Sequence, residues 1–132
     1  MKKTYFFVML FSIYYSQAQD VVSPNDNSSN YYFNSFIDEP ATFPNGIVAF
    51  EKFFKENFVV NENIPTYRNP IKVFMEFIVE NDGTISSLRI TRGFGYNSVK
   101  EGLRVLKKSP KWIPGRENGK IVRAKCEIYC EI

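Results

Sequence analysis

The sequence predicts an α+β fold in which two helices pack on one face of a three-stranded antiparallel sheet, in the order helix, strand, strand, helix, strand. Two segments carry apolar residues at helical spacing, and three segments alternate apolar with polar residues as half-buried strands do. The chain has 132 residues, of which 44% are hydrophobic and 23% are charged. These values fit one globular domain with a short extra segment, and they argue against a mainly disordered, collagenous or polytopic membrane chain.

The chain begins with the pattern of a secretory signal peptide. Lys2 and Lys3 precede an apolar run over residues 5–15, and Ser16 and Ala18 occupy the −3 and −1 positions of a cleavage site. A membrane-spanning helix needs about 20 apolar residues, roughly twice the length of this run. We therefore expect cleavage, with an uncleaved membrane anchor as the alternative. No cysteine lies near the site, which argues against a lipoprotein anchor.

A polar leader is expected between the signal peptide and the domain. The segment Asp20–Ser35 is rich in Asn, Ser and Asp, a composition typical of a flexible lead-in. Asn27-Ser28-Ser29 fits a glycosylation acceptor, although this pattern is common by chance. The predicted divisions are a signal peptide over 1–18, the leader over 19–36 and the folded domain over 37–132.

The first helix is predicted over Ile47–Phe58, after the turn-forming run Phe43-Pro44-Asn45-Gly46. Apolar residues recur there at spacings of three and four, and charged residues take the opposite side. The apolar stripe consists of Ile47, Phe50, Phe53, Phe54 and Phe58. Residues 59–69 contain a proline and several asparagines, so they are predicted to form a loop.

A β-hairpin is predicted next, with Ile71–Glu80 as its first strand. Asn81-Asp82-Gly83 is a tight-turn signal, so Thr84–Arg92 is expected to fold back as the second strand, which Gly93-Phe94-Gly95 ends. The apolar face of the first strand consists of Val73, Met75, Phe77 and Val79.

A second helix is predicted over Asn97–Lys108 and ends before Pro110. Asn118-Gly119 predicts a turn, and the last strand is expected to extend from Lys120 to the C-terminus. If the first strand lies between the other two, the sheet is antiparallel throughout. The C-terminal strand then lies on an open edge of the sheet.

Charge is divided unevenly along the chain. Ten acidic and four basic residues lie between Gln19 and Leu88, whereas two acidic and eleven basic residues lie between Arg89 and Lys125. We interpret the basic half as solvated helix and strand positions, with an anionic membrane surface, polyanion or acidic peptide as the alternative partner. No nucleic-acid motif accompanies the charge, so no nucleic-acid partner is expected.

The sequence lacks the residues on which most enzymes depend. It has no histidine, which excludes His-dependent triads, His general bases and the usual zinc ligand sets. Its carboxylates form no recognisable acid–base pair, and we expect no catalytic residue, no cofactor and no metal. Gly93-Phe94-Gly95 is interpreted as a strand-to-helix turn rather than a phosphate-binding loop, because it lacks a Lys-Ser/Thr pair and a third glycine.

Two cysteines and one tryptophan have alternative interpretations. Cys126 and Cys130 lie four residues apart in a strand, which separates their Cα atoms by about 13 Å. A disulfide needs less than about 7 Å, so they cannot pair with each other in a straight strand. We interpret them as core residues, with an intermolecular bridge or a reactive thiol as the alternative. Trp112 is interpreted as holding a turn against the core, with a binding role as the alternative.

Five short motifs follow one another along the predicted domain. They are Phe43-Pro44-Asn45-Gly46, the strand end and turn from Phe77 to Ile85, Arg92-Gly93-Phe94-Gly95, the run from Pro110 to Gly115, and Asn118-Gly119-Lys120. In this order and spacing, over Ile37–Ile132, they resemble the C-terminal domain of the TonB family of energy transducers. The fold of that family, two helices on a three-stranded antiparallel sheet, agrees with the periodicity.

The resemblance implies a protein-binding domain in the periplasm of a Gram-negative bacterium. TonB-like domains engage the N-terminal segment of an outer-membrane TonB-dependent transporter by adding it as a strand, in support of energy-coupled transport. If the N-terminal segment is retained, the chain is membrane-associated and an inner-membrane proton-channel complex is a further partner. The alternative is a free periplasmic or secreted adaptor that binds another envelope protein, or a second copy of itself as a homodimer through the edge strand.

The resemblance also places the partner beside the C-terminal strand. The expected contact strip consists of Val122, Arg123, Ala124, Lys125, Cys126, Glu127, Ile128 and Tyr129. The charged side chains of this strip blunt an exposed edge against aggregation, and Tyr129 is placed to pack against an added strand.

Overall fold

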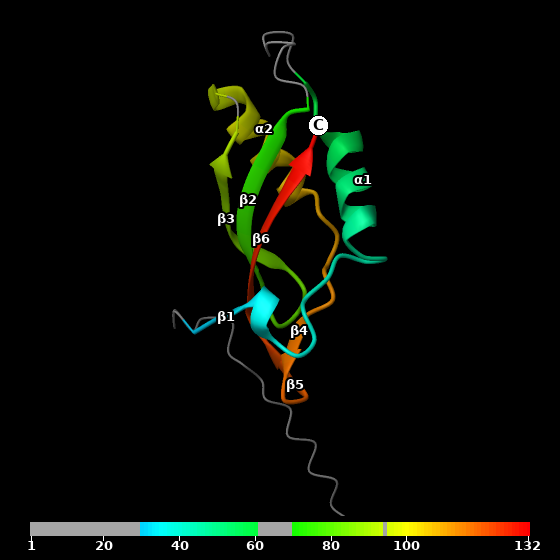
Figure 1. Ribbon diagram of the computed structural model, residues 1–132, viewed down its shortest axis with the longest axis vertical. Coiled ribbons are helices and arrows are strands. Elements are labelled where there is room, and N and C mark those ends of the chain that lie inside the picture. Colours follow the sequence, from blue (N-terminus) through cyan, green and yellow to red (C-terminus); the bar gives the residue numbers. More distant parts are fainter. Residues whose placement is uncertain (1–29, 61–69, 94) are drawn as a thin grey trace, which may run out of the picture.

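The computed structural model describes residues 30–60, 70–93 and 95–132 of the chain (Figure 1). Its elements are β1 (Tyr32–Phe33), the 3₁₀ helix η1 (Asn34–Phe36), α1 (Ile47–Asn57), β2 (Lys72–Val79), β3 (Ile85–Arg92), α2 (Gly95–Lys107), β4 (Gly115–Glu117), β5 (Lys120–Val122) and β6 (Ala124–Glu131). Both predicted helices and the predicted hairpin of β2 and β3 are confirmed to within two residues at each end. The predicted signal peptide, the glycosylation acceptor and most of the predicted loop over 59–69 lie outside the described residues.

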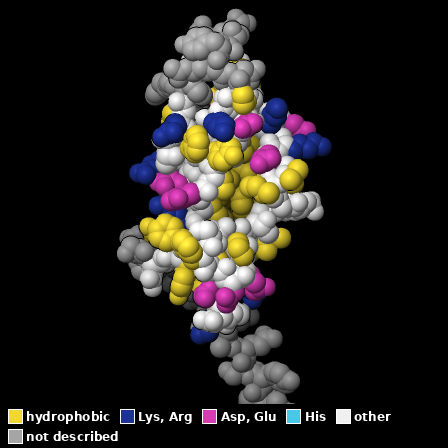
Figure 2. All heavy atoms as spheres, in the orientation of Figure 1, with side chains coloured by type: hydrophobic (Ala, Val, Ile, Leu, Met, Phe, Trp, Pro, Cys, Tyr) yellow, Lys and Arg dark blue, Asp and Glu magenta, His cyan; other side chains and the backbone are white. Residues whose placement is uncertain are grey.

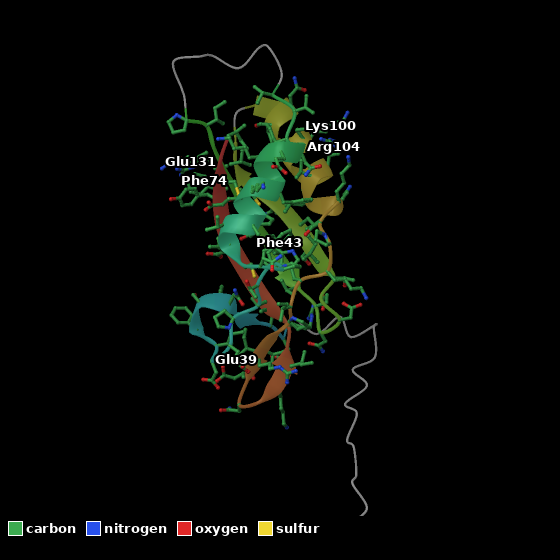
Figure 3. All side chains as sticks on the ribbon, turned by 90° about the vertical axis from the view of Figure 1, so that its right-hand side faces the viewer. Glu39, Phe43, Phe74, Lys100, Arg104 and Glu131 are labelled. Atoms are coloured by element: carbon green, nitrogen blue, oxygen red, sulfur yellow. The ribbon has the colours of Figure 1, made fainter. Side chains whose placement is uncertain are left out.

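The main sheet has four strands in the order β1-β6-β2-β3. β2 pairs antiparallel with β6 and β3, whereas β1 pairs parallel with β6. Both helices pack on the same face of this sheet, as Figure 3 shows from the side. β4 and β5 form a separate two-stranded sheet. The α+β class and the central place of β2 are confirmed, but the prediction of a three-stranded antiparallel sheet is wrong, because the sheet is mixed and has a fourth strand.

The buried face of the sheet follows the predicted alternation. The inward side chains of β2 are at most 1% exposed. Across the ladder they face inward residues of β6, such as Ala124 beside Val79 and Cys130 beside Val73. The helices cover this face with Phe50, Phe54, Val105 and Leu106, all of them 0% exposed. Burial of each such large side chain stabilises the fold by about 1.5–3 kcal/mol, so this layer is the main source of stability.

The turn between β2 and β3 docks onto Trp112. Gly83 in this turn has a φ of +85°, and its carbonyl accepts a hydrogen bond of 2.8 Å from the Trp112 backbone N–H. The indole ring is 5% exposed, and its centroid lies 5.0–5.6 Å from those of Phe43, Phe50 and Phe77. The Trp112 side chain therefore packs in the core, as predicted, and its backbone holds the β2–β3 turn, which was not predicted.

The fourth strand comes from the segment that was expected to be a flexible leader. Tyr32 and Phe33 lie parallel beside Ala124 and Lys125, and the Tyr32 N–H donates a hydrogen bond of 2.9 Å to the Arg123 carbonyl. A strand of two residues is too short to display an alternation, so no periodic signal marks it in the sequence.

The predicted last strand is divided into β5 and β6. β5 pairs antiparallel with β4 around Asn118 and Gly119, whose φ values of +51° and +76° are those of a type I′ turn. β6 begins at Ala124, which pairs with Val79, the last residue of β2. Because β2 ends there, the residues of β5 lie beyond the β2 ladder and pair with β4 instead.

Candidate functional site

The residues of the predicted contact strip, Val122–Tyr129, differ in which strands they pair with. Val122 is the last residue of β5 and pairs with Gly115 of β4. Ala124 and Lys125 have a strand on each side, β2 on one and β1 on the other. The expectation of an open edge is therefore wrong for the first half of the strip, since strands from elsewhere in the chain cover it. The second half, from Cys126 to Tyr129, lies within β6.

The open part of the edge extends over Cys126–Glu131. In an antiparallel ladder, alternate residues turn their N–H and C=O groups toward the partner strand. The Ile132 N–H donates to the Ile71 carbonyl on the β2 side at 2.8 Å, whereas the Arg123 carbonyl accepts from Tyr32 on the opposite side. Odd-numbered residues of β6 thus turn their backbone groups away from β2. The outward groups that no strand of the described chain pairs with are those of Glu127, Tyr129 and Glu131.

An aromatic pair lies beside this edge, on the face of the sheet away from the helices. The ring centroids of Phe74 and Tyr129 are 5.3 Å apart. The Lys72 ammonium lies 5.1 Å from the Tyr129 ring centroid and 3.5 Å from the Glu131 carboxylate. Figure 3 shows Phe74 and Glu131 pointing away from the helices. Since the Tyr129 side chain is 49% exposed, a strand added at this edge can contact its ring.

Lys125 is engaged within the protein. Its ammonium lies 3.4 Å from the Glu76 carboxylate, which also lies 2.5 Å from Arg89. On its other side it faces the rings of Tyr31 and Phe33, whose centroids are 5.6 and 5.8 Å away. This predicted contact residue therefore already has partners on both sides.

Arg123 joins the start of β6 to the end of β2. Its guanidinium donates to the Glu80 carboxylate from Nε at 2.7 Å and from Nη2 at 3.1 Å, and the Ser86 hydroxyl donates to the same carboxylate. The hydrogen bond from Arg123 lowers the pKa of Glu80 below its ordinary value, against the opposing effect of partial burial. The ion pair between Arg123 and Glu80 therefore holds the start of β6 beside the end of β2.

Apolar side chains flank the open edge. α1 and η1 both contact β6, and Phe36, Ile47 and Val48 on them are 83%, 50% and 73% exposed. Figure 2 shows hydrophobic side chains around a hollow on this face of the molecule, between α1 and η1. Side chains of an added strand that point toward the helices would be covered there.

Cys126 and Cys130 are core residues, as predicted. They are 2% and 1% exposed, and neither forms a disulfide. Burial raises the pKa of both thiols to about 12, so neither is a thiolate at neutral pH. Along the edge these two residues present backbone only.

Basic side chains gather on α2, at a distance from this edge. Lys100, Arg104 and Lys107 line an open hollow together with Val59 and Val60. Figure 3 shows Lys100 and Arg104 on the opposite side of the molecule from Phe74. The Arg104 guanidinium pairs with Glu101 in the preceding helical turn, which lowers the pKa of that carboxyl. The exposed lysines agree with the interpretation of a solvated helix face.

The other candidate features are structural. β3 ends and α2 begins at the predicted glycine turn, where a Cβ on Gly93 would lie 2.8 Å from the Ser98 hydroxyl oxygen. Across residues 30–60, 70–93 and 95–132, no three His, Cys, Asp or Glu side chains gather as a metal site would require. The helices of that same part are too short or too polar to cross a membrane.

Sequence reasoning missed β1 and the contact that holds it. The Asn34 side chain accepts a hydrogen bond from the Ala41 N–H at 2.6 Å and donates one to the Ala41 carbonyl at 3.1 Å. The available signal was the aromatic run Tyr31-Tyr32-Phe33 in an otherwise polar segment. Such a run indicates burial or pairing, but it does not identify the partner strand.

Comparison with known proteins gives no relative for this chain. No protein-family model, no curated protein and no solved structure matches it.

Proposed function

We propose that this chain is a protein-binding domain that accepts an extended segment of a partner as an added strand along Cys126–Glu131. The observation that carries the proposal is the row of outward backbone groups at Glu127, Tyr129 and Glu131, which have no strand partner among the described residues. Main-chain hydrogen bonds would provide the affinity of such a complex, and alternate side chains would provide its selectivity.

The surface beside the open edge is apolar on the helix side of the sheet and more polar on the other side, so it favours a partner strand with one apolar and one polar face. Successive side chains of a strand point in opposite directions. Those directed toward the helices would meet the apolar flank that includes Phe36 and Val48, and those directed away would meet Tyr129 and the carboxylate of Glu131. An extended segment that alternates apolar with polar side chains fits this arrangement best.

We infer the identity of the partner from the resemblance to the TonB family. We propose the N-terminal segment of an outer-membrane TonB-dependent transporter, bound in the periplasm in support of energy-coupled transport. Two features support this assignment. One is the order and spacing of the five motifs, and the other is an open edge on the C-terminal strand, where the resemblance places the partner.

Photo-crosslinking in cells tests the proposal. A photo-reactive residue is placed at position 127, where the Glu127 side chain is 62% exposed beside the open edge. The matched control places it at position 121, where Ile121 is 43% exposed on β5. We expect position 127, and not position 121, to capture the N-terminal segment of an outer-membrane transporter, identified by mass spectrometry.

The other outcomes distinguish the alternatives. Capture of a different envelope protein, or of a second copy of this chain, at position 127 would contradict the transporter assignment and favour an adaptor. Equal capture at both positions, or no capture by a correctly folded protein, would contradict strand addition at this edge.

A further inference from the structure

We propose that residues 30–33, which comprise Asn30, Tyr31 and β1, form a removable strap over the β6 edge, and that a partner strand extending beyond Cys126–Glu131 displaces the strap when it binds. The inference rests on the proposed function, because it concerns the same edge. It adds an autoinhibitory contact that limits access to this edge.

The strap covers the part of the β6 edge that adjoins the proposed binding strip, Cys126–Glu131. β1 pairs with Ala124 and Lys125, and η1 follows directly and also contacts β6. The open part is therefore confined to Cys126–Glu131, which is about the length of one average strand. A partner that bound with the strap in place would have to end at β1. Release of the strap would open two more positions of β6 for pairing.

The strap is held by few interactions. β1 is two residues long, and its side chains are about half exposed, at 50% for Tyr32 and 47% for Phe33. Removing the strap from the sheet therefore exposes little additional apolar surface, and segments with so little burial are the ones that open locally in folded proteins.

The strap has a defined hinge. The side chain of Asn34, the next residue after the strap, forms two hydrogen bonds with Ala41, and Ile37, the next residue after η1, is 7% exposed in the core. A Cβ on Gly115 would lie 2.5 Å from Ile37 Cδ1, so this side chain is closely packed. Residues 30–33 can therefore leave the sheet while the Asn34–Ala41 hydrogen bonds and the core packing of Ile37 are kept.

Competition for one edge has a measurable consequence. A partner that binds only the open form has an affinity reduced by the fraction of molecules in that form. One or two ladder hydrogen bonds, at about 1 kcal/mol each, hold β1 together with the contacts of the Tyr31 and Phe33 rings with the Lys125 ammonium. The hydrogen bonds alone correspond to a reduction of about tenfold. Locking the strap should weaken capture of a partner, and releasing it should strengthen capture.

Amide hydrogen exchange tests whether the strap opens, without any partner. The Tyr32 N–H, bonded to Arg123, is compared with the N–H of the buried Trp112, which bonds to the Gly83 carbonyl. We expect the Tyr32 amide to exchange at least about a hundredfold faster in the native protein. Equal rates for the two amides would mean that the strap opens only when the whole protein unfolds, and this would overturn the inference.

Two variants test whether opening controls access. Phe33→Cys with Lys125→Cys places two thiols on directly paired residues, where a disulfide would lock the strap, and each single substitution is a matched control. Tyr32→Pro removes the N–H that bonds to Arg123, and Tyr32→Ala keeps it as the control. Capture is measured with the photo-reactive residue at position 127 used above. We expect up to about tenfold more capture for Tyr32→Pro than for Tyr32→Ala, and less capture for the locked variant than for its single-cysteine controls.

The outcomes separate this inference from the proposed function. Equal capture of the transporter segment by the locked variant and its single-cysteine controls would overturn the strap while leaving strand addition in place. Absence of capture from every variant, including Tyr32→Pro, would contradict strand addition itself and the strap with it.

Discussion

Replacing Gly83 with alanine is expected to lower the free energy of unfolding far more than the same change at Gly119. Both glycines have a positive φ, of +85° and +76°, so each substitution introduces backbone strain of about 1 kcal/mol. Their surroundings differ. A Cβ at Gly83 would lie 2.2 Å from the Trp112 carbonyl oxygen, whereas a Cβ at Gly119 would have no neighbour within 4 Å.

The magnitude follows from the contact between the turn and Trp112. A separation of 2.2 Å cannot be kept, so the turn must move away from Trp112 by about 1 Å. That movement breaks the hydrogen bond from the Trp112 N–H to the Gly83 carbonyl, at a cost of about 1 kcal/mol. Looser packing of the indole ring adds about 1–2 kcal/mol. We expect Gly83→Ala to cost about 3–4 kcal/mol in total and Gly119→Ala to cost about 1 kcal/mol.

Urea unfolding followed by tryptophan fluorescence measures both losses, because Trp112 is the one tryptophan of the chain. The slope of the free energy of unfolding against urea concentration must stay the same between variants for the comparison to hold. A loss for Gly83→Ala within about 0.5 kcal/mol of the loss for Gly119→Ala would refute the steric argument, since the two variants would then differ only in backbone strain.

Two further predictions concern titratable groups. Arg123 lowers the pKa of Glu80 in the folded protein, so ionised Glu80 stabilises the fold above its unfolded pKa, and this contribution is lost as the pH falls through the lower folded pKa. Urea midpoints at pH 7 and pH 2 should differ less for Glu80→Gln than for the parent protein, and an equal difference would refute this. Burial raises the pKa of Cys126 and Cys130 to about 12, so a thiol reagent at pH 8 should modify them only after unfolding. Rapid modification of the folded protein would contradict their buried position.

The helices and the β2–β3 hairpin could be predicted because their signals are local. Phe50 and Phe54 lie one helical turn apart and are both 0% exposed, and the alternation from Val73 to Val79 matches the inward face of β2. The Asn118-Gly119 turn was equally predictable, since few other residue pairs accept a positive φ at both positions. In each case the residues that make the structure are neighbours in the sequence.

β1 and the division of the last strand could not be predicted, because they depend on distant partners. The alternation of Val122, Ala124 and Cys126 continues across the break, although Val122 pairs with β4 and Ala124 with β2. An alternating pattern indicates which face a side chain occupies, but it does not indicate which strand lies alongside. The same holds for the candidate site. The sequence predicted that β6 pairs with β2, but it did not predict that Tyr32 and Phe33 cover part of the other edge of β6.

The charges along the open edge also bear on whether two copies of the chain pair through it. A symmetric antiparallel pair of β6 edges centred on Tyr129 would place Glu127 of one copy opposite Glu131 of the other, twice. Like charges directly opposite each other in a sheet are destabilising, and these side chains are 62% and 49% exposed. An open edge is an aggregation hazard that proteins reduce by charge or by cover, and this edge has acidic side chains on its open part and β1 on the rest. The arrangement disfavours a second copy and favours a partner strand without acidic side chains at those two positions.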